Sequence, residues 1–183
     1  NGAVATTAAG GVSLTGTNLA LNNTITTTGT GPVTVNESGT ATIAATGDII
    51  SDGAVSLTAT GGISTAGDVT TTDDDVTYVS ATTLTGPVSI TTGAGGAGNI
   101  TFSSTLNGTQ DLTLLAGTGN ITFTGVVGGT TPLEDVIITS ATNVTATTFS
   151  AATLTQSAGS GTTTLNGAVA TTAAGGVSLT GTN

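Results

Sequence analysis

Short triplets of an apolar, a hydroxyl-bearing and an apolar residue recur along the chain. Examples are VSL at 12–14, VTV at 33–35, VSL at 55–57 and VTY at 76–78. This alternation has a period of two, so the apolar side chains share one face of an extended strand and the hydroxyls the other. Thr, Val and Ile favour strands, and no stretch carries apolar residues at helical spacing over the length of a helix. The pattern predicts an all-β chain with many short strands.

The triplets recur at nearly constant spacing. Their first residues, at 12, 33, 55 and 76, are separated by 21, 22 and 21 positions, and ITF follows at 100–102 and 121–123. A second series, with VSI at 88–90, LTL at 112–114 and VII at 136–138, steps by 24 and 24. The spacing predicts a structural unit of about 21–24 residues that contains at least two strands.

Turn-forming residues separate the predicted strands. Gly, Asn and Asp flank most triplets, as in TGTN at 15–18 and GGTTP at 128–132. Pro32, Pro87 and Pro132 each stand directly before a predicted strand, where a missing backbone N–H disturbs sheet pairing least. We therefore interpret the prolines as structural.

A much longer repeat contains these short units. Residues 1–18, NGAVATTAAGGVSLTGTN, recur unchanged at 166–183, an offset of 165 positions. An identity of this length does not arise by chance, even in a chain of biased composition. We predict that residues 1–165 form one long repeat of seven or eight short units and that 166–183 begin the next identical repeat. The shared segment favours a tandem array in one continuous chain over a filament assembled from separate subunits.

Two all-β architectures fit these periods. In a β-solenoid each short unit is one coil, and coils stack about 4.8 Å apart, whereas in tandem sandwiches each long repeat closes as its own domain. We favour the solenoid because three Phe and one Tyr are few for a sandwich core, and because Phe102 with Phe123 and Asn99 with Asn120 recur at the coil spacing. The predicted fold class is all-β, a parallel β-helix or β-solenoid. One long repeat would measure about 35 Å.

Composition excludes most kinds of catalysis. The chain of 183 residues has no Lys, Arg, His, Cys, Met or Trp, and ten Asp and Glu residues give it a net charge of −10. It therefore lacks an imidazole base, a thiolate, a Schiff-base amine and the nitrogen and sulfur ligands of zinc, copper and haem sites. We predict no enzyme, no catalytic residues and no cofactor. Without cations to neutralise phosphates no nucleic-acid binding is expected, and the short apolar runs predict no membrane insertion.

The densest group of charges, Asp73, Asp74 and Asp75, is a candidate calcium site. Carboxylate oxygens are the ligands that Ca²⁺ prefers, but the Gly-Gly-x-Gly-x-Asp sequence of calcium-binding β-helix repeats is absent. We favour the alternative that the three residues form a solvated turn before a strand beginning at Val76, and we predict no metal site. Glu134 and Asp135 precede another predicted strand and are interpreted in the same way.

Pairs of Thr residues raise the possibility of an ice-binding face. Such pairs occur at 15/17, 26/28 and 58/60, and a flat hydroxyl face would need one pair in every coil. A step of 21 positions from the first pair reaches Asn36 and Ser38, so a row of Thr pairs does not continue from coil to coil. We prefer the interpretation that Thr is the ordinary outward residue of these strands.

Six Asn-x-Ser/Thr sequences are candidate acceptors of glycans. A chain rich in Thr produces such sequences through composition alone, so they are a weak indication. They begin at Asn22, Asn36, Asn99, Asn107, Asn120 and Asn143.

Several segments resemble the repeats of giant filamentous-haemagglutinin-like surface proteins of bacteria. These segments are GNITF at 98–102 and 119–123, DLTLLAGTG at 111–119 and TLTGPVSI at 83–90. The resemblance covers essentially the whole chain and lies in composition and in the order of strand and turn residues. It implies a right-handed parallel β-helix, export across the cell envelope, and a role in adhesion, matrix or fibre formation.

These observations predict a structural repeat of a long extracellular filament or bacterial surface fibre. The expected partners are further copies of the repeat, stacked end to end or bundled side by side, with divalent cations or glycans as additional ligands. A chain without Lys, Arg, Cys or Met offers no cleavage point to trypsin-like proteases and few targets for oxidation, which suits an exposed material. The alternatives are an adhesin stalk that contacts a host, a surface or a polysaccharide and, less favoured, an ice-binding solenoid.

Overall fold

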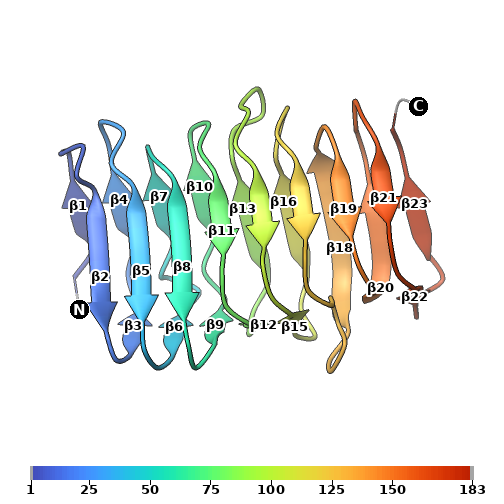
Figure 1. Cartoon of the computed structure of the whole chain (residues 1–183), viewed down its shortest axis with the longest axis horizontal. Coiled ribbons are helices and arrows are strands. Elements are labelled where there is room, and N and C mark those ends of the chain that lie inside the picture. Colours follow the sequence, from blue (N-terminus) through green and yellow to red (C-terminus); the bar gives the residue numbers. More distant parts are fainter. Residues whose placement is uncertain (1, 182–183) are drawn as a thin grey trace.

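The alternating triplets fold into the strands of a β-solenoid. In the computed structural model, which describes residues 2–181, neighbouring strands pair in parallel, and no helix occurs among those residues. Successive strands lie on the three sides of a triangular stack, and the chain winds from one end of the stack to the other (Figure 1). The predicted all-β fold and its parallel stacking are therefore confirmed.

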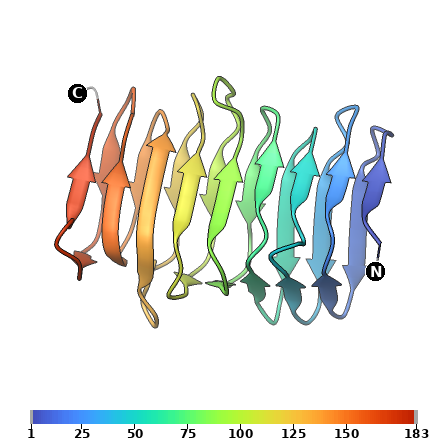
Figure 2. The ribbon, with the colours of Figure 1, turned by 180° about the vertical axis from the view of Figure 1, so that it is seen from behind.

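The first sheet lies on the far side of the stack in Figure 1 and faces the reader in Figure 2. It has ten strands. Nine of them follow one another in a single pairing order, and the tenth, β23, pairs with β20, which also pairs with β22. The strands are β1 (Val4–Thr6), β4 (Ile25–Thr27), β7 (Ile49–Ser51), β10 (Val69–Thr71), β13 (Val88–Thr91), β16 (Leu112–Leu115), β18 (Leu133–Ser140), β20 (Phe149–Gln156), β22 (Val169–Thr171) and β23 (Val177–Leu179).

The second sheet faces the reader in Figure 1 and has eight strands, one for each coil. It contains the first series of triplets, from which the coil spacing was predicted. The strands are β2 (Val12–Gly16), β5 (Val33–Glu37), β8 (Val55–Ala59), β11 (Val76–Tyr78), β14 (Ile100–Phe102), β17 (Ile121–Phe123), β19 (Val144–Ala146) and β21 (Thr163–Leu165).

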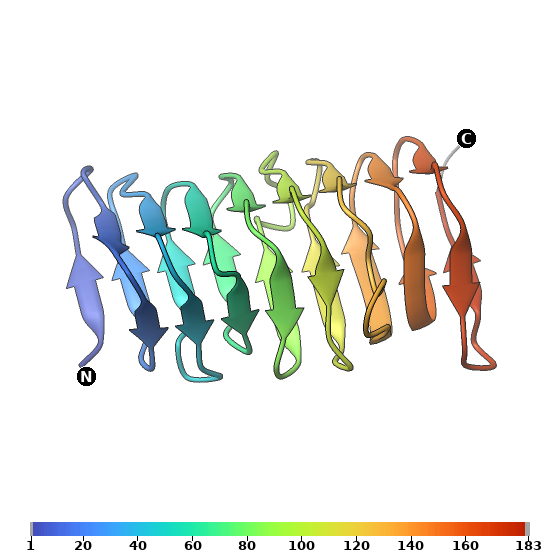
Figure 3. The ribbon, with the colours of Figure 1, turned by 60° about the horizontal axis from the view of Figure 1, so that its bottom comes forward.

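The third sheet closes the triangle along the lower edge of Figure 1, and Figure 3 brings that edge forward. Beyond its last strand the third side continues as single bridges, from Leu106 to Val127 and from Val127 to Phe149, the first residue of β20. The sequence predicted at least two strands per coil, and the third carries no repeating triplet. Its five strands are β3 (Leu19–Leu21), β6 (Ala41–Ile43), β9 (Ile63–Thr65), β12 (Thr82–Leu84) and β15 (Leu106–Asn107).

Coil length varies more than the sequence predicted. Ile25 pairs with Ile49, 24 positions on, and Ile49 pairs with Val69, 20 positions on. Near the end of the stack Val136 pairs with Leu154, only 18 positions on. The predicted range of 21–24 is therefore too narrow. The coil from Val136 to Leu154 is short because β20 runs from the third side into the first sheet as one continuous strand, without turn residues between the two sides.

A column of aromatic rings fills the middle of the core. Tyr78, Phe102 and Phe123 are direct partners in adjacent coils and are fully buried. Tyr78 stacks on Phe102 with ring centroids 4.9 Å apart, and Phe102 stacks on Phe123 at 5.5 Å. In the next coil the same position is Ala146, and Phe149 from the third side contacts Phe123 edge to face at 5.6 Å. The predicted alignment of Phe102 with Phe123 is confirmed.

Buried hydroxyls line the inner corner between the first and second sheets. Thr27, Ser51, Thr71 and Thr92 lie at the ends of first-sheet strands and point inward. Each donates a hydrogen bond to a backbone carbonyl of a corner turn, as Ser51 does to Gly31 at 3.0 Å. Because a buried hydroxyl without a partner is unfavourable, these bonds let Thr and Ser occupy the core while they hold the turns in place.

The corner before β5 depends on a glycine in the preceding coil. Gly11 has a φ of +64°, and a Cβ on it would lie 1.9 Å from the carbonyl oxygen of Pro32. No other residue type fits so close an approach. Pro32, Pro87 and Pro132 directly precede β5, β13 and β18, which confirms their predicted position.

The acidic pair Glu134 and Asp135 is placed differently from the prediction. Strand β18 begins at Leu133, so both residues lie inside the strand and not before it. Pairing of Leu133 with Ala151 and of Asp135 with Thr153 extends the ladder beyond the apolar triplet, which is why the sequence pattern located the start of the strand too late. Both acidic residues are exposed to solvent, as expected.

Candidate functional site

An unbroken row of hydroxyl side chains runs along the outer face of the second sheet. Each of its eight strands contributes one Ser or Thr, and successive members are direct partners in the strand register. The side chains are exposed or half-buried and stand about 4.8 Å apart. This hydroxyl row consists of Ser13, Thr34, Ser56, Thr77, Thr101, Thr122, Thr145 and Thr164.

A second row, two positions further along the strands, does not continue. Thr15 pairs with Asn36 and Asn36 with Thr58, and in the next coil β11 ends at Tyr78, before the corresponding position. Thr26, from another of the Thr pairs, lies in the first sheet beside Ile50. Within the described second sheet the regular hydroxyl surface is therefore one residue wide.

A ladder of amide side chains occupies the corner that leads into the second sheet. Oδ1 of Asp75 accepts hydrogen bonds from the backbone N–H of Asn99 at 2.7 Å and from its Nδ2 at 2.9 Å. In the next coil Oδ1 of Asn99 accepts hydrogen bonds from the backbone N–H and from Nδ2 of Asn120, each at 3.0 Å. Oδ1 of Asn120 in turn accepts from the backbone N–H of Asn143 at 3.2 Å and from its Nδ2 at 2.8 Å. Asn143 then accepts the N–H of Thr162 at 2.9 Å. These five residues, the Asn ladder, each directly precede a second-sheet strand and join five coils.

Other carboxylates connect neighbouring coils in a similar way. Asp48 accepts the N–H of Asp68 at 3.0 Å, and Asp68 accepts that of Ser89 at 2.7 Å. Asp111 accepts the N–H of Asp135 at 3.1 Å. Sequence reasoning did not identify this role for Asp48, Asp68 and Asp111. The signal was available, because each acceptor and its donor are about one coil apart in the sequence.

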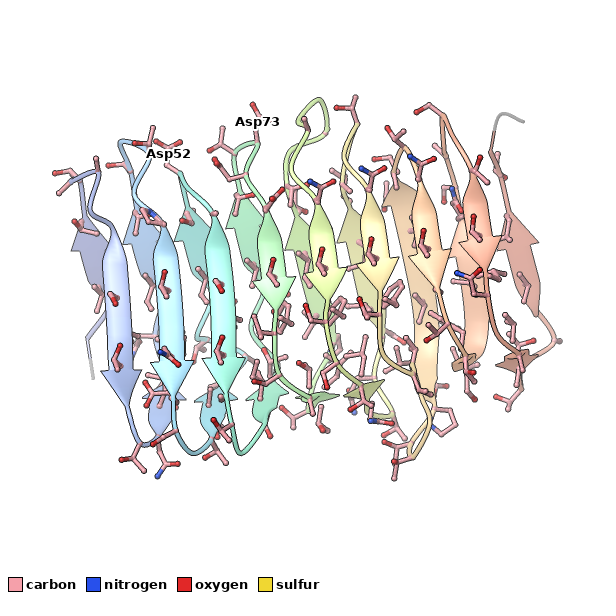
Figure 4. The ribbon with its side chains drawn as sticks, in the orientation of Figure 1. Asp52 and Asp73 are labelled. Atoms are coloured by element: carbon pink, nitrogen blue, oxygen red, sulfur yellow. The ribbon has the colours of Figure 1, made fainter. Side chains whose placement is uncertain are left out.

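The three candidate calcium ligands have different surroundings. Asp75 belongs to the Asn ladder, and the backbone carbonyl of Asp74 accepts the hydroxyl of Thr71. Asp73, labelled in Figure 4, lies against the backbone of the next coil, since a Cβ on Gly96 would be 2.1 Å from its Oδ1. Among residues 2–181 no group of three or more acidic side chains is placed to hold a metal ion. The structure places these residues in the turn before β11.

Asp52, at the same edge of the stack in Figure 4, connects three coils. Its carboxylate accepts the N–H of Thr30 from the preceding coil at 2.8 Å and the hydroxyl of Thr72 from the following coil at 3.1 Å. Thr30 has a φ of 66°, a conformation that β-branched residues rarely adopt, and its bond to Asp52 stabilises it. The bond from Thr30 and then that from Thr72 hold the pKa of Asp52 below its ordinary value.

A shallow groove of about 280 Å³ crosses the first sheet beside Asp52. It is lined by residues 26–28, 50–52 and 70–72, which are mainly Thr. Asp52 is the one acidic residue of its lining, so the groove lacks the pair of carboxyl groups on which most glycoside hydrolases depend.

Glu37 points into the stack at the end of β5. It is 4% exposed, and its Oε2 has no hydrogen-bond partner. A Cβ on Gly16, the partner of Glu37 in the preceding coil, would lie 3.0 Å from Oε2, so the missing side chain at Gly16 leaves room for this carboxyl group. The position follows from strand alternation, because Val33 and Val35 of the same strand also point inward.

Three of the six candidate glycan acceptors already use the side-chain nitrogen to which a glycan would be attached. Nδ2 of Asn99, Asn120 and Asn143 donates within the Asn ladder, so a glycan there would displace a ladder bond. Asn107 accepts the N–H of Thr130 at 2.9 Å through Oδ1.

Comparison of the chain with protein-family models, curated proteins and solved structures found no match. Within residues 2–181 there is no helix with the length and apolar character needed to cross a membrane. The described residues present a regular row of hydroxyl groups on the outer surface and carboxylates that connect neighbouring coils.

Proposed function

We propose that the chain is a structural repeat of a long extracellular filament or bacterial surface fibre, of the filamentous-haemagglutinin-like class that its sequence resembles. Its role is to build and hold a rod, without catalysis. The observation that carries the proposal is the placement of the second copy of the 18-residue segment. This copy adds to the stack as β22 and β23, both paired with β20. A further long repeat can therefore continue the same ladder.

The outer surface also suits a rod exposed to the environment. The hydroxyl row runs along the outer face of the second sheet, and five of the ten acidic side chains accept backbone N–H groups that connect coils: Asp48, Asp52, Asp68, Asp75 and Asp111. The net charge of −10 keeps separate rods apart through repulsion. Divalent cations would offset that repulsion and allow rods to bundle.

The length of tandem chains tests the proposal. Chains with one, two and three copies of residues 1–165 should form rods that lengthen by about 37 Å per copy. Each copy contributes between seven and eight coils, and the coils stack about 4.8 Å apart. Cryo-electron microscopy should show a meridional reflection near 4.8 Å. Beads of constant size joined by linkers would contradict the proposal and favour an adhesin stalk of separate domains.

The hydroxyl row is a specific observation in favour of a second candidate function, the binding of ice. A regular row is present, but the neighbouring row is interrupted at Asn36 and ends after Thr58. We expect a surface one hydroxyl wide to be too narrow for this role. Thermal hysteresis of the purified chain, measured beside a variant with Thr101→Lys in the row, would support ice binding if only the unaltered chain were active.

A further inference from the structure

The two copies of the 18-residue segment begin on different sides of the triangle. In the first copy Val4 opens β1 and pairs with Ile25 in the first sheet. In the second copy the equivalent residue, Val169, opens β22 and pairs with Phe149. Although hydrogen bonds join β20 and β22 to the first sheet, Phe149 is at the third-side end of β20, where it bridges to Val127, so β22 also lies on the third side. The first strand of the segment therefore lies in the first sheet in the first copy and on the third side, which is the preceding side along the chain, in the second copy.

The next strand of the segment has moved by the same amount. Val12 of the first copy pairs with Val33 in the second sheet. Its equivalent, Val177, pairs with Leu154 in the first sheet. Both strands of the second copy thus lie one side earlier than their counterparts, so the displacement applies to the segment as a whole.

The local structure of the segment is the same in both places. The N–H of Gly11 donates to the carbonyl of Ala8 at 3.0 Å, and that of Gly176 donates to Ala173 at 3.1 Å. The two glycines have φ of +64° and +55°. One turn therefore fits the corner between the first and second sheets and also the corner between the third side and the first sheet.

We propose that consecutive long repeats are related by one third of a turn about the rod axis, so that each 165-residue repeat contains seven and two-thirds coils. This inference depends on the continuous tandem rod proposed above.

The rotation distributes the surface features of the repeat around the rod. The hydroxyl row of one repeat lies on the second side, that of the next on the first side, and that of the third on the third side. The orientation returns after three repeats, which is 495 residues and 23 coils. Each side of a long rod would then present the same features in turn, so identical rods can approach one another equally from three directions.

Cross-linking at the junction tests the rotation. Ser178, the equivalent of Ser13, lies beside Thr155 in the first sheet. Without rotation it would instead extend the hydroxyl row beside Thr164.

The chain contains no Cys, so cysteine pairs can be introduced and cross-linked with a short bis-maleimide. The two double variants to compare are Thr155→Cys with Ser178→Cys and Thr164→Cys with Ser178→Cys. Ser56→Cys with Thr77→Cys, neighbours within the row, is the matched control. Each is made in the 183-residue chain and in a chain extended through the second repeat.

We expect the pair at 155 and 178 to cross-link as fast as the control pair, and the pair at 164 and 178 not to cross-link. The opposite result would overturn the rotation and leave the continuous rod intact. Cross-linking of both pairs would overturn a single fixed rotation. If only the control pair reacted in the extended chain, the second repeat would not stack on the first, and the proposed rod would fail with the rotation.

Discussion

Two sections of the stack share one strand pattern and differ in what fills the core. In the aliphatic section (β2, β5 and β8) the second inward position of each strand is Leu14, Val35 or Leu57. In the aromatic section (β11, β14 and β17, with β19 as its last strand) that position is Tyr78, Phe102 or Phe123 and becomes Ala146 at β19. The backbone register is the same in both sections. The same coil backbone therefore accommodates either an aliphatic or an aromatic side chain at this position.

The corner before the second sheet differs between the two sections as well. Gly11, Pro32 and Ala54 precede the strands of the aliphatic section, and none has a polar side chain. The strands of the aromatic section follow the Asn ladder. Stacked rings contribute about 0.5–1.5 kcal/mol per pair beyond their burial, and the ladder adds hydrogen bonds between the same coils. We infer that the aromatic section is the more stable part of the repeat and that unfolding begins in the aliphatic section.

The largest expected effect is that of Phe123→Ala. This ring contacts Phe102 on one side and Phe149 on the other, so its removal should lower the free energy of opening of this section by about 3–5 kcal/mol. Native-state hydrogen exchange of β14, β17 and β19 measures the change. Leu14→Ala in the end coil is the comparison and should cost less than half as much, because Leu14 is only half-buried. Equal losses would contradict the difference between the sections.

A smaller loss, about 2 kcal/mol, is expected for Asn120→Ala. The substitution removes the acceptor of the Asn143 N–H and two side-chain bonds of the ladder. Denaturant unfolding followed by circular dichroism provides the measurement. Asn18→Ala is the control in the aliphatic section, where Asn18 accepts from the backbone and hydroxyl of Thr40 at an exposed corner. The ladder has no special role if the two variants lose equal stability.

Tyr78→Phe should leave stability at neutral pH unchanged or slightly higher, because the buried hydroxyl makes no hydrogen bond of ordinary geometry, although Thr65 lies beside it. Burial and, secondarily, the charge of Asp68 raise the pKa of Tyr78 well above its ordinary value of 10.0. The folded chain therefore favours the neutral phenol. Its stability should be complete below pH 10.0 and should fall as the pH rises from there toward the raised pKa.

The composition of the chain makes this pH dependence specific. There is one Tyr and no Lys, Arg or Cys, so no other side chain titrates in that range. Alkaline denaturation, followed by circular dichroism and by phenolate absorbance, should show a loss of stability in the unaltered chain that is absent from Tyr78→Phe. An equal alkaline loss in the two chains would show that Tyr78 is not the group responsible.

The smallest effect is expected for Asp52→Asn, at the exposed edge of the aliphatic section. The pKa of Asp52 lies below its ordinary value of 3.8, so its contribution is present above pH 3.8 and is lost as the pH falls through the lowered pKa. The variant should resemble the unaltered chain at the lowest pH and be slightly less stable at neutral pH. Acid unfolding curves of the two chains provide the test, and identical curves at every pH would contradict the role of Asp52.

The sequence predicted the parts of the fold that recur in it. The triplets located the strands of the second sheet, and the spacing predicted that Phe102 and Phe123 would be neighbours, as they are. The third side was missed because its short strands share no repeating pattern. The shortened coil at Val136 and Leu154 was missed because nothing in the apolar pattern shows that β20 passes a corner without a turn.

The chemistry of the acidic residues was harder to predict than the fold. Asp48, Asp68 and Asp75 stand before strands in segments that look like ordinary solvated turns. Their hydrogen-bond donors lie in the next coil, so the role depends on the register between coils, which turn composition alone does not reveal. The unbroken hydroxyl row was overlooked for a related reason. Pairs such as Thr15 and Thr17 are the conspicuous hydroxyl pattern in the sequence, whereas the row consists of the single central residue of each strand triplet.

The strictly neighbouring contacts of the coils have a consequence for a chain under tension. Strands pair only with strands of the adjacent coils, so a pull on the two ends can detach the terminal coil while the others stay folded. A detached coil of about 22 residues extends to about 75 Å, whereas it occupied about 4.8 Å of the folded rod. The repeat can thus lengthen more than tenfold in small separate steps, absorb work at each step and shorten again by restacking its coils.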